Sequence, residues 1–289
     1  MRLGAQISVA GGLHNAFERG ADAGCDAIMI FTKSNRQWKA KPITEKDVAA
    51  YRAAERVYAD IYPVTVHASY LINVASSDPV LWQRSYDALK IEVERAETIG
   101  AKMLVFHPGA YVDADEEQGL TNIARALRQL LEETTDGKLG ICLETMAGTG
   151  TTLGHRFEQL AWLREESGGH PRLGVCFDTC HVFAAGYDVR SPEAYAATME
   201  MFGEIVGLEH LHCFHLNDSR YDVGTRRDRH AHIGEGQIGL GGFANFVNDS
   251  RWQSHAAYLE TPKTETDEQG NEIEMDPVNL KALRELIGT

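Results

Sequence analysis

A single pattern occupies residues 62–107: YPVTVH (Tyr62–His67), then DPVLWQRSYDALKIEVERAETI (Asp78–Ile99), then MLVFH (Met103–His107). The first and last stretches are short apolar runs rich in β-forming residues. In the middle stretch, apolar residues recur at helical spacing and charged residues fill the other face. A short apolar run, an amphipathic helix and a second apolar run are typical of one βα unit of a parallel sheet.

The same alternation extends over the whole chain. Eight β-rich runs can be counted: Leu3–Ser8, Ala27–Phe31, Tyr62–His67, Met103–His107, Gly140–Glu144, Leu173–Asp178, His212–Leu216 and Ala257–Glu260. Amphipathic stretches such as Leu120–Glu133 lie between them. Eight such units predict an α/β fold, a single (β/α)₈ TIM barrel. Because no Pro- or Ser-rich linker divides the chain, we expect one domain over residues 1–289.

Composition excludes several classes of protein. The 289 residues contain 28 Lys and Arg against 42 Asp and Glu, a formal net charge of −14. This charge argues against a uniformly basic surface that binds polyanions, but a nucleic-acid enzyme with local positive charge or bound metal ions stays open. No stretch approaches the roughly 18 uninterrupted apolar residues that a membrane span requires.

The first residues and the cysteines indicate a compartment. The N-terminal MRLGAQISVAGG lacks the basic leader, apolar core and cleavage site of a secretory signal. Of five cysteines, Cys142, Cys176 and Cys213 lie inside apolar runs, which indicates reduced core thiols. We therefore expect a cytoplasmic protein that does not associate with a membrane.

Six consecutive predicted strands end in residue types that bind metal ions. They are His67, His107, Glu144, Asp178, His215 and Glu260, separated by 34 to 45 residues, about one βα unit each. Because the C-terminal ends of barrel strands converge on one rim, these six side chains are expected to form a metal site there.

Three further candidates lie close by in sequence. His181 follows Asp178 by three residues, which places both on one face if the strand passes into a helical turn. Asp228 and His230 point the same way if their loop is extended. Five imidazoles and four carboxylates suffice for three metal sites with open positions. This mixed set without cysteine suits Zn²⁺ better than Mn²⁺ or Fe²⁺.

The remaining histidines are given no metal-binding role. Five that are isolated in the sequence are expected to be surface or structural residues: His14, His155, His170, His210 and His255. His212 alternates with His215 along its strand and should therefore face the helices. His232 could support His230 from behind.

Two acidic segments are interpreted as structural. Asp113–Glu117 should begin the helix after the fourth strand, because carboxylates favour a helix N-terminus. Lys263–Asp276 should form an exposed loop before a final helix that starts near Pro277.

Six long motifs are spread over the chain: GAQISVAGG (Gly4–Gly12), HASYLIN (His67–Asn73), FDTCHVFAAGYD (Phe177–Asp188), HLNDSR (His215–Arg220), DRHAHIGEG (Asp228–Gly236) and YLETPK (Tyr258–Lys263). They closely resemble the endonuclease IV family of apurinic/apyrimidinic (AP) endonucleases. The resemblance implies a (β/α)₈ DNA-repair enzyme with three zinc ions per chain that cuts the DNA backbone 5′ to an abasic site.

The resemblance also implies roles for individual residues. It divides the ligands into three sets: His67, His107 and Glu144; Glu144 again with Asp178, His215 and Glu260; and His181, Asp228 and His230. Glu144 and Glu260 are then the catalytic residues, which bridge metal ions and orient a zinc-bound hydroxide. The chain departs from the family at Gln6, where His is usual, and at Thr145, where Asn is usual. The segment His107–Val112 also differs from the usual form.

Two basic loops predict a local positive field on an acidic protein. The loop Thr32–Thr44 contains Trp38, no acidic residue, and the cations Lys33, Arg36, Lys39 and Lys41. The second loop carries Arg220, Arg226, Arg227 and Arg229. Three bound zinc ions would add six positive charges and change the formal net charge from −14 to −8.

By resemblance, Arg36, Tyr70 and Leu71 are the side chains that enter the duplex. The expected partner is double-stranded DNA containing abasic sites, which stack poorly and are cheap to open. Expected products are a 3′-hydroxyl and a 5′-deoxyribose phosphate, with removal of 3′-blocking groups as a second activity. We expect a monomer, associated with the nucleoid if the source is bacterial.

Two other functions are compatible with parts of this pattern. Sugar isomerases and epimerases use similar barrels with Glu, Asp and His ligands for one or two divalent ions. A noncatalytic damage-binding protein with structural zinc is the other alternative, although structural zinc sites are closed and often rich in thiolates. Nine ligands and the basic loops favour the nuclease.

Overall fold

Eight parallel strands close into a barrel in the order β1-β10-β7-β6-β5-β4-β3-β2 in the computed structural model, which describes residues 1–134, 137–267 and 269–288. The barrel strands are β1 (Arg2–Gln6), β2 (Ala27–Ile30), β3 (Val64–His67), β4 (Met103–Phe106), β5 (Gly140–Glu144), β6 (Leu173–Asp178), β7 (Leu211–His215) and β10 (Ala256–Leu259). Each predicted run matches one strand to within two residues at either end. The predicted (β/α)₈ TIM barrel is confirmed.

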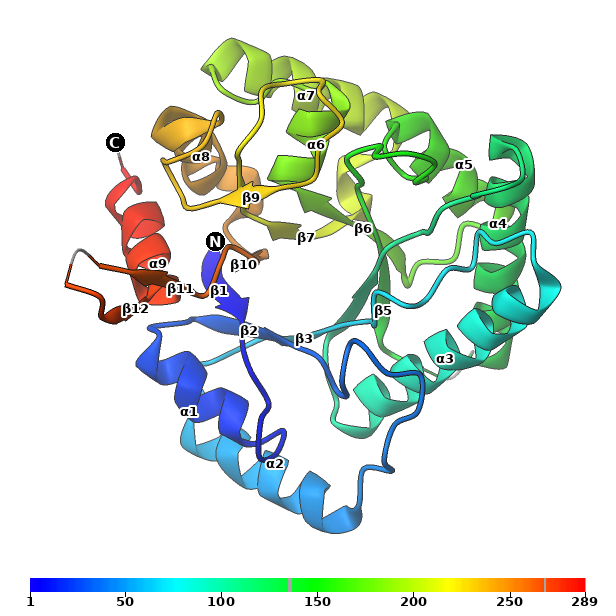
Figure 1. Ribbon diagram of the computed structural model, residues 1–289, viewed down its shortest axis with the longest axis horizontal. Coiled ribbons are helices and arrows are strands. Elements are labelled where there is room, and N and C mark those ends of the chain that lie inside the picture. The colour runs from blue at the N-terminus through cyan, green and yellow to red at the C-terminus, as the bar shows by residue number, and fades with distance from the viewer. Residues whose placement is uncertain (135–136, 268, 289) are drawn as a thin grey trace.

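Helices surround the barrel on all sides (Figure 1). They are α1 (Asn15–Asp22), α2 (Glu45–Val57), α3 (Pro79–Thr98), α4 (Glu116–Glu133), α5 (Phe157–Glu166), α6 (Thr179–Ala185), α7 (Pro192–Ile205), α8 (Gly239–Asn248) and α9 (Met275–Glu285). α3 begins where the sequence predicts, because the Asp78 carboxylate accepts hydrogen bonds from the N–H groups of Val80 and Leu81. None of the described helices is long and apolar enough to cross a membrane.

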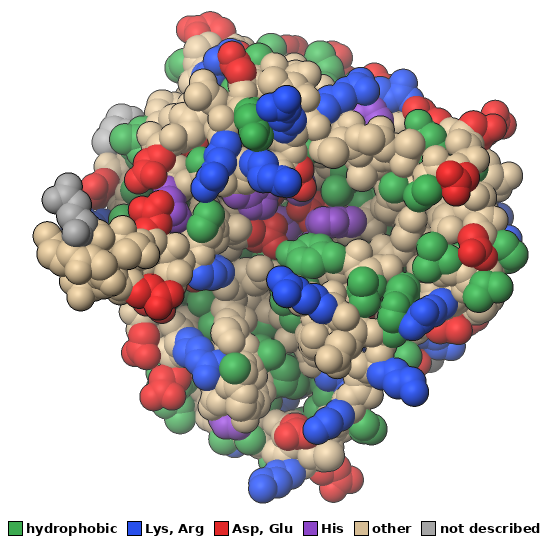
Figure 2. All heavy atoms as spheres, viewed as in Figure 1, with side chains coloured by type: hydrophobic (Ala, Val, Ile, Leu, Met, Phe, Trp, Pro, Cys, Tyr) green, Lys and Arg blue, Asp and Glu red, His purple; other side chains and the backbone are tan. Residues whose placement is uncertain are grey.

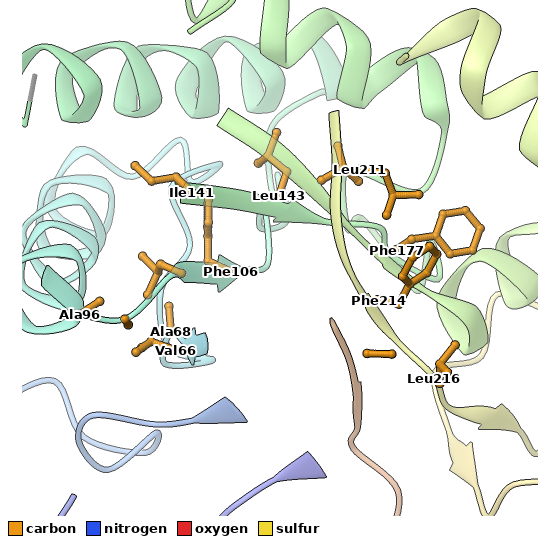
Figure 3. Close-up of a cluster of buried hydrophobic side chains, with 14 of the residues drawn as sticks. Val66, Ala68, Ala96, Phe106, Ile141, Leu143, Phe177, Leu211, Phe214 and Leu216 are labelled. Atoms are coloured by element: carbon orange, nitrogen blue, oxygen red, sulfur yellow. The ribbon is translucent and has the colours of Figure 1, made fainter. Parts of the chain in front are cut away.

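Alternation along the strands divides the buried side chains into two layers. Residues on the outer face, such as Val66, Leu143 and Phe177, pack toward the helices (Figure 3). Residues on the inner face form a second cluster inside the barrel: Ala27, Met29, Met103, Val105, Cys142, Cys176, Cys213, Ala256 and Tyr258. All five cysteines are buried and free of disulfides, as expected of core thiols.

His212 faces the barrel interior, so the prediction that it faces the helices is wrong. Its Nδ1 lies 3.7 Å from Cys142 Sγ. The pairing of β6 with β7 shifts register at this point, which makes His212 an extra residue in β7. Such a β-bulge breaks the alternation of side chains. Gly174 leaves space for the imidazole, because a Cβ there would lie 2.2 Å from its Nδ1.

Within the described ranges, two short antiparallel pairs lie outside the barrel: β8 (Asp218–Ser219) with β9 (His230–Ala231), and β11 (Thr264–Thr266) with β12 (Glu272–Glu274). The second pair corrects the prediction of an exposed loop over Lys263–Asp276, in which residue 268 lies outside the described residues. The hairpin is closed at its base by an ion pair, with Lys263 Nζ 2.9 Å from Asp276 Oδ2. The final helix begins at Met275, two residues before the predicted start at Pro277.

The glycine-rich segment after β9 is organised by one buried carboxylate. Asp218 accepts hydrogen bonds from the N–H groups of Gly234, Gly236 and Ile238. Because Asp218 also belongs to β8, these bonds tie the segment to the strand that pairs with His230. The position of His230 at the rim therefore depends on Asp218.

The acidic run at the start of α4 behaves as predicted. Asp115 caps the helix, with its carboxylate accepting a hydrogen bond from Gln118 N–H at 2.8 Å. Glu116 and Glu117 lie in the first turn, where the helix dipole favours negative charge.

Candidate metal centre and active site

The nine predicted ligands meet at the C-terminal rim of the barrel. Among the described residues, ligand atoms lie within 4.8 Å of one another in four overlapping groups: His67, His107 and Glu144; Glu144, Asp178, His215 and Glu260; Asp178, His181 and His230; and Cys180, Asp228 and His230. The first two groups coincide with two of the expected ligand sets. Figure 2 shows His, Asp and Glu side chains together in the hollow at the middle of this face.

Glu144 lies at the centre of the cluster, fully buried at the end of β5. Its Oε2 is 3.0 Å from His67 Nε2 and 3.2 Å from His107 Nε2. Its Oε1 is 3.1 Å from His215 Nδ1 and 3.2 Å from His181 Nδ1. The two oxygens of this carboxylate thus face different groups of ligands, the arrangement that a bridging residue requires.

The third expected set is assembled by a turn and a loop. Asp178 caps α6, and its Oδ1 accepts a hydrogen bond from His181 N–H at 2.8 Å, which places both on one face as predicted. From the other side, Asp228 Oδ1 lies 3.2 Å from His181 Nε2 and 3.6 Å from His230 Nε2. Cys180 also has its sulfur close to Asp228 and His230, a neighbour that the sequence did not suggest.

Backbone carbonyl groups orient three of the imidazoles. Each Nδ1–H can donate to a carbonyl oxygen: His67 to Ala68 at 2.8 Å, His181 to Thr145 at 2.9 Å, and His230 to Glu260 at 3.2 Å. With Nδ1 protonated, the lone pair is on Nε2, the atom that faces the cluster. These rings are therefore oriented to offer Nε2 to a cation.

The carboxylates and imidazoles of the cluster shift one another's pKa values. Burial would raise the pKa of the Glu144 carboxyl, but the imidazoles of His215 and His107 outweigh burial and hold that pKa well below its usual range. The same opposition, with His215 as the main partner, lowers the pKa of Glu260 to about 2. Burial opposes the charged His215 imidazole, yet Glu260 and Glu144 raise its pKa well above the usual value. Ionised carboxylates in a buried site favour a cation.

Asn217 supports two of the predicted ligands, a role that its place in the HLNDSR motif did not predict. Its Nδ2 donates to Asp178 Oδ2 at 2.6 Å, and its Oδ1 accepts from Glu260 N–H at 2.7 Å. Thr145, one of the two departures from the family pattern, also supports Asp178, because its Oγ1 accepts from Asp178 N–H at 2.9 Å. Both residues hold ligands from neighbouring strands in place.

The three candidate DNA-contacting side chains lie on the loops that follow β2 and β3. Tyr70 is 49% exposed, and its ring centroid lies 5.4 Å from those of both His67 and His107. Arg36 is exposed and Leu71 partly buried. Tyr70 therefore links the cluster of nine predicted ligands to the open face.

One cation of the first basic loop does not contribute to the open face. The side chain of Lys33 is only 4% exposed and pairs with the buried Glu92 on α3, with 3.0 Å between Nζ and Oε1. Its predicted contribution to the surface field is wrong, because the side chain turns inward to neutralise a buried carboxylate. Arg36, Lys39 and Lys41 are exposed.

The second basic loop borders a cavity beside the third ligand group. All four of its arginines are exposed: Arg220, Arg226, Arg227 and Arg229. The cavity, of about 390 Å³, lies between this loop and the loop after β5, with Met146, Tyr221, Arg227 and Asp228 in its lining. The Arg227 guanidinium lies 4.7 Å from the centroid of the Tyr221 ring. Figure 2 shows Lys and Arg side chains around the central hollow.

His232 supports the periphery of the site. Its Nε2 lies 3.0 Å from Glu265 Oε1 on β11, and its Nδ1 lies 3.0 Å from Asn279 Nδ2 on α9. These contacts connect the strand that carries His230 to the C-terminal hairpin and helix.

Comparison with known proteins identifies the family. The profile of the xylose isomerase-like TIM barrel family matches residues 17–283. A probable endonuclease 4 from Chloroflexus aggregans is 48% identical over 99% of this chain and 98% of its own length. The crystal structure of endonuclease IV from Thermus thermophilus superposes with a TM-score of 0.83 at 34% identity, covering 99% of this chain and 98% of that one.

A more distant structure shares the fold alone. A D-tagatose 3-epimerase-like protein superposes with a TM-score of 0.73 at 21% identity, covering 99% of this chain and 97% of its own. The endonuclease relatives are much more similar in sequence and match this chain along nearly its full length. The chain therefore belongs to the endonuclease IV family within the xylose isomerase-like TIM barrels.

Proposed function

We propose that this protein is a DNA-repair endonuclease that hydrolyses the phosphodiester 5′ to an abasic site in duplex DNA. Its products are a 3′-hydroxyl and a 5′-deoxyribose phosphate, and it also removes 3′-blocking groups. The observation that carries this proposal is the connected cluster of nine His, Asp and Glu side chains, set between exposed basic loops in a member of the endonuclease IV family. We further propose that it acts as a cytoplasmic monomer with one domain.

The donor set fits three zinc ions. Among the described residues, His230 Nε2 and Glu260 Oε1 are buried polar atoms of the cluster without a hydrogen-bond partner. Such atoms are costly unless something binds them, and a metal ion would do so. We assign the ligand sets as follows: His67, His107 and Glu144; Glu144, Asp178, His215 and Glu260; and His181, Asp228 and His230.

The side chains around the cluster prepare it for phosphodiester hydrolysis. Bound zinc would supply a strong nucleophile at neutral pH and would compensate the charge that develops on the phosphate. Glu144 and Glu260 are the proposed catalytic residues, because Glu144 faces two ligand groups with its two oxygens and Glu260 Oε2 lies 3.1 Å from His215 Nδ1, so that both carboxylates would hold the metal ions and orient the attacking group. Asn217 keeps Asp178 and the backbone of Glu260 in register.

Recognition of the lesion is assigned to the loops. An abasic site has lost its base, and with it the stacking and pairing that hold a nucleotide in the duplex, so extruding its sugar costs less than extruding an intact nucleotide. We propose that Arg36, Tyr70 and Leu71 enter the duplex there. Tyr70 is well suited to this role, because its exposed ring rests directly against the imidazoles of the cluster. The exposed arginines after β8 would hold the flanking phosphates.

Cleavage of a labelled duplex with one tetrahydrofuran abasic analogue tests the proposal, with no magnesium added and product ends mapped. The analogue cannot undergo β-elimination, so a cut on its 5′ side that leaves a 3′-hydroxyl demonstrates hydrolysis. A Glu260→Gln preparation, purified identically, should lose the activity and thereby exclude a contaminating nuclease. If the abasic duplex remains uncut after incubation with folded, metal-loaded protein, the proposal is overturned.

The same experiment separates the two alternatives. Binding of the abasic duplex without cleavage would favour a damage-binding protein. Neither binding nor cleavage, with one or two metal ions per chain, would favour a sugar epimerase, whose fold this barrel shares.

A further inference from the structure

A buried carboxylate outside the metal-ligand cluster receives contacts from two loops at once. Glu92 lies on α3 and is 1% exposed. Its Oε1 is 3.0 Å from Lys33 Nζ and accepts a hydrogen bond from Ser69 N–H at 3.2 Å. Its Oε2 accepts a hydrogen bond from Thr32 Oγ1 at 3.1 Å. Two of these donors belong to the loop after β2, and the third belongs to the loop after β3.

These loops carry the candidate DNA-contacting side chains. The first loop (residues 31–44) carries Arg36, and the second loop (residues 68–78) carries Tyr70 and Leu71. In Figure 1 the first loop runs from β2 toward α3 before it turns back to α2. The side chains that would probe the duplex therefore come from two segments that are separated in sequence by a helix and a strand.

Further contacts join the loops to each other and to α3. Ser69 Oγ in the second loop donates to Asn35 O in the first at 2.8 Å. Arg95, one turn after Glu92 on α3, donates from Nε to Thr32 Oγ1 at 3.0 Å. The Arg84 guanidinium, also on α3, lies 4.2 Å from the centroid of the Trp38 ring. Glu92 is the carboxylate at which both loops meet.

Physical chemistry gives this arrangement a consequence for binding. A buried charge is costly to leave unpaired, so Glu92 and Lys33 hold each other in place strongly. Loops that are ordered before the ligand arrives do not pay the cost of ordering on binding. Ordering both loops on one carboxylate also fixes the distance between their tips.

We propose that Glu92 is a positioning residue that holds Arg36 and Tyr70 in one preformed arrangement for the abasic duplex. The identity of this ligand rests on the function proposed above. The joint ordering of the two loops does not rest on it, because it is a property of the free protein.

Glu92→Gln tests the proposal, since it preserves size and removes the charge. A hydrogen bond to a charged group is worth about ten- to a hundredfold in an equilibrium, so KM for the abasic duplex should rise by about tenfold or more. Because the variant leaves the metal ligands untouched, kcat at saturating duplex and zinc content should stay near the wild-type values. Amide hydrogen exchange in the free protein should quicken in residues 31–44 and 68–78 together.

Two further variants give the test its controls. Lys90→Met removes an exposed ion pair from the same helix, where Lys90 Nζ lies 2.7 Å from Glu133 Oε2, and should change neither KM nor loop exchange. Ser69→Ala removes the direct bond between the loops and should raise KM and the exchange of both loops to a lesser extent. If Glu92→Gln does not fold with its unpaired Lys33, Glu92→Gln/Lys33→Met removes both charges and takes its place.

Results that overturn the role of Glu92 can be distinguished from results that overturn the proposed function. An unchanged KM for the variant, or faster exchange in one loop alone, would overturn the positioning role. So would a fall in kcat that accompanies faster exchange throughout the chain, since that pattern indicates general destabilisation. If the wild type neither binds nor cuts the abasic duplex, the proposed function fails, and the exchange comparison still decides whether Glu92 orders both loops.

Discussion

At the scale of single residues, the candidate site depends on side chains that touch its ligands without belonging to them. Asn217 holds Asp178 with its amide nitrogen and the backbone of Glu260 with its amide oxygen. Thr145 provides an oxygen for Asp178 N–H and a carbonyl for His181. Residues that orient metal ligands in this way set both the geometry of a site and its affinity.

Replacing Asn217 should therefore weaken metal binding while the fold survives. We expect Asn217→Ala to lower zinc affinity by about ten- to a hundredfold, because Asp178 loses a hydrogen bond that orients its carboxylate. Competition with a chromophoric chelator measures this affinity. Asn245→Ala, which removes hydrogen bonds to carbonyl groups away from the cluster, serves as the control. Equal zinc affinity in the two variants would contradict the role given to Asn217.

Replacing Tyr70 should have the opposite profile. Tyr70→Ala is expected to weaken binding to abasic duplex by about 1 to 3 kcal/mol, the usual range for an aromatic ring that stacks on a base, with zinc content unchanged. Fluorescence anisotropy and metal analysis on the same preparation provide the two measurements. Tyr62, 55% exposed at the opposite end of the barrel, is a matched aromatic control. Zinc loss that parallels the loss of binding would show that Tyr70 is structural.

At the scale of elements, the bulge in β7 shows how one strand adapts to its neighbours. The extra residue turns His212 into the barrel, and the glycine opposite it on β6 leaves space for the ring. The strand then resumes its alternation, so that Cys213 and His215 both face inward and His215 reaches the ligand cluster at the rim.

Filling this space should be destabilising. In Gly174→Ala the new methyl group would lie 2.2 Å from the His212 ring, and overpacking of this kind costs about 1 to 3 kcal/mol of unfolding free energy. Urea denaturation followed by circular dichroism measures the change. Gly241→Ala is the control, because Gly241 lies on the exposed side of α8 and a Cβ there would be 3.9 Å from its nearest neighbour, the Arg190 carbonyl oxygen. This substitution should raise the free energy of unfolding by about 0.5 to 1 kcal/mol. A stabilising effect of Gly174→Ala would contradict the description of the bulge.

At the scale of the whole molecule, charge is distributed unevenly. The chain carries a formal net charge of −14, yet exposed arginines and lysines lie on the loops around the rim. Within that rim, buried carboxylates face one another across the imidazoles. Bound cations would pair with these carboxylates in the folded protein alone, since the unfolded chain does not bring the ligands together.

Removing metal ions should therefore lower the stability of the entire barrel. Because ligands that bind only the folded state stabilise it by mass action, we expect chelation to lower Tm by at least about 5 °C and added zinc to restore it. Calorimetry gives the shift, and elemental analysis of the untreated protein should find three zinc ions per chain. A Tm indifferent to chelation, or fewer than three ions at saturation, would contradict the proposed ligand assignment.

The sequence by itself determined the barrel fold and which side chains meet at its C-terminal rim. Eight runs at the spacing of βα units leave few architectures available, and parallel strands in a barrel must end on the same rim. His67, Glu144 and Asp178 are separated by dozens of residues, yet their places at strand ends are sufficient to predict that they meet. The order of elements carries this information, and no contact between distant residues has to be known.

The tertiary structure alone decided which way individual side chains turn and what supports them. From the sequence, Lys33 is predicted to be a surface cation, but in the fold it turns inward to pair with Glu92. His212 is predicted to face the helices, but the bulge between β6 and β7 turns it into the barrel. The role of Asn217 depends likewise on the adjacent strand. The physical reason is common to all of these: burial, register and hydrogen-bond partners are set by segments far away in the chain, whereas periodicity reports only what is local.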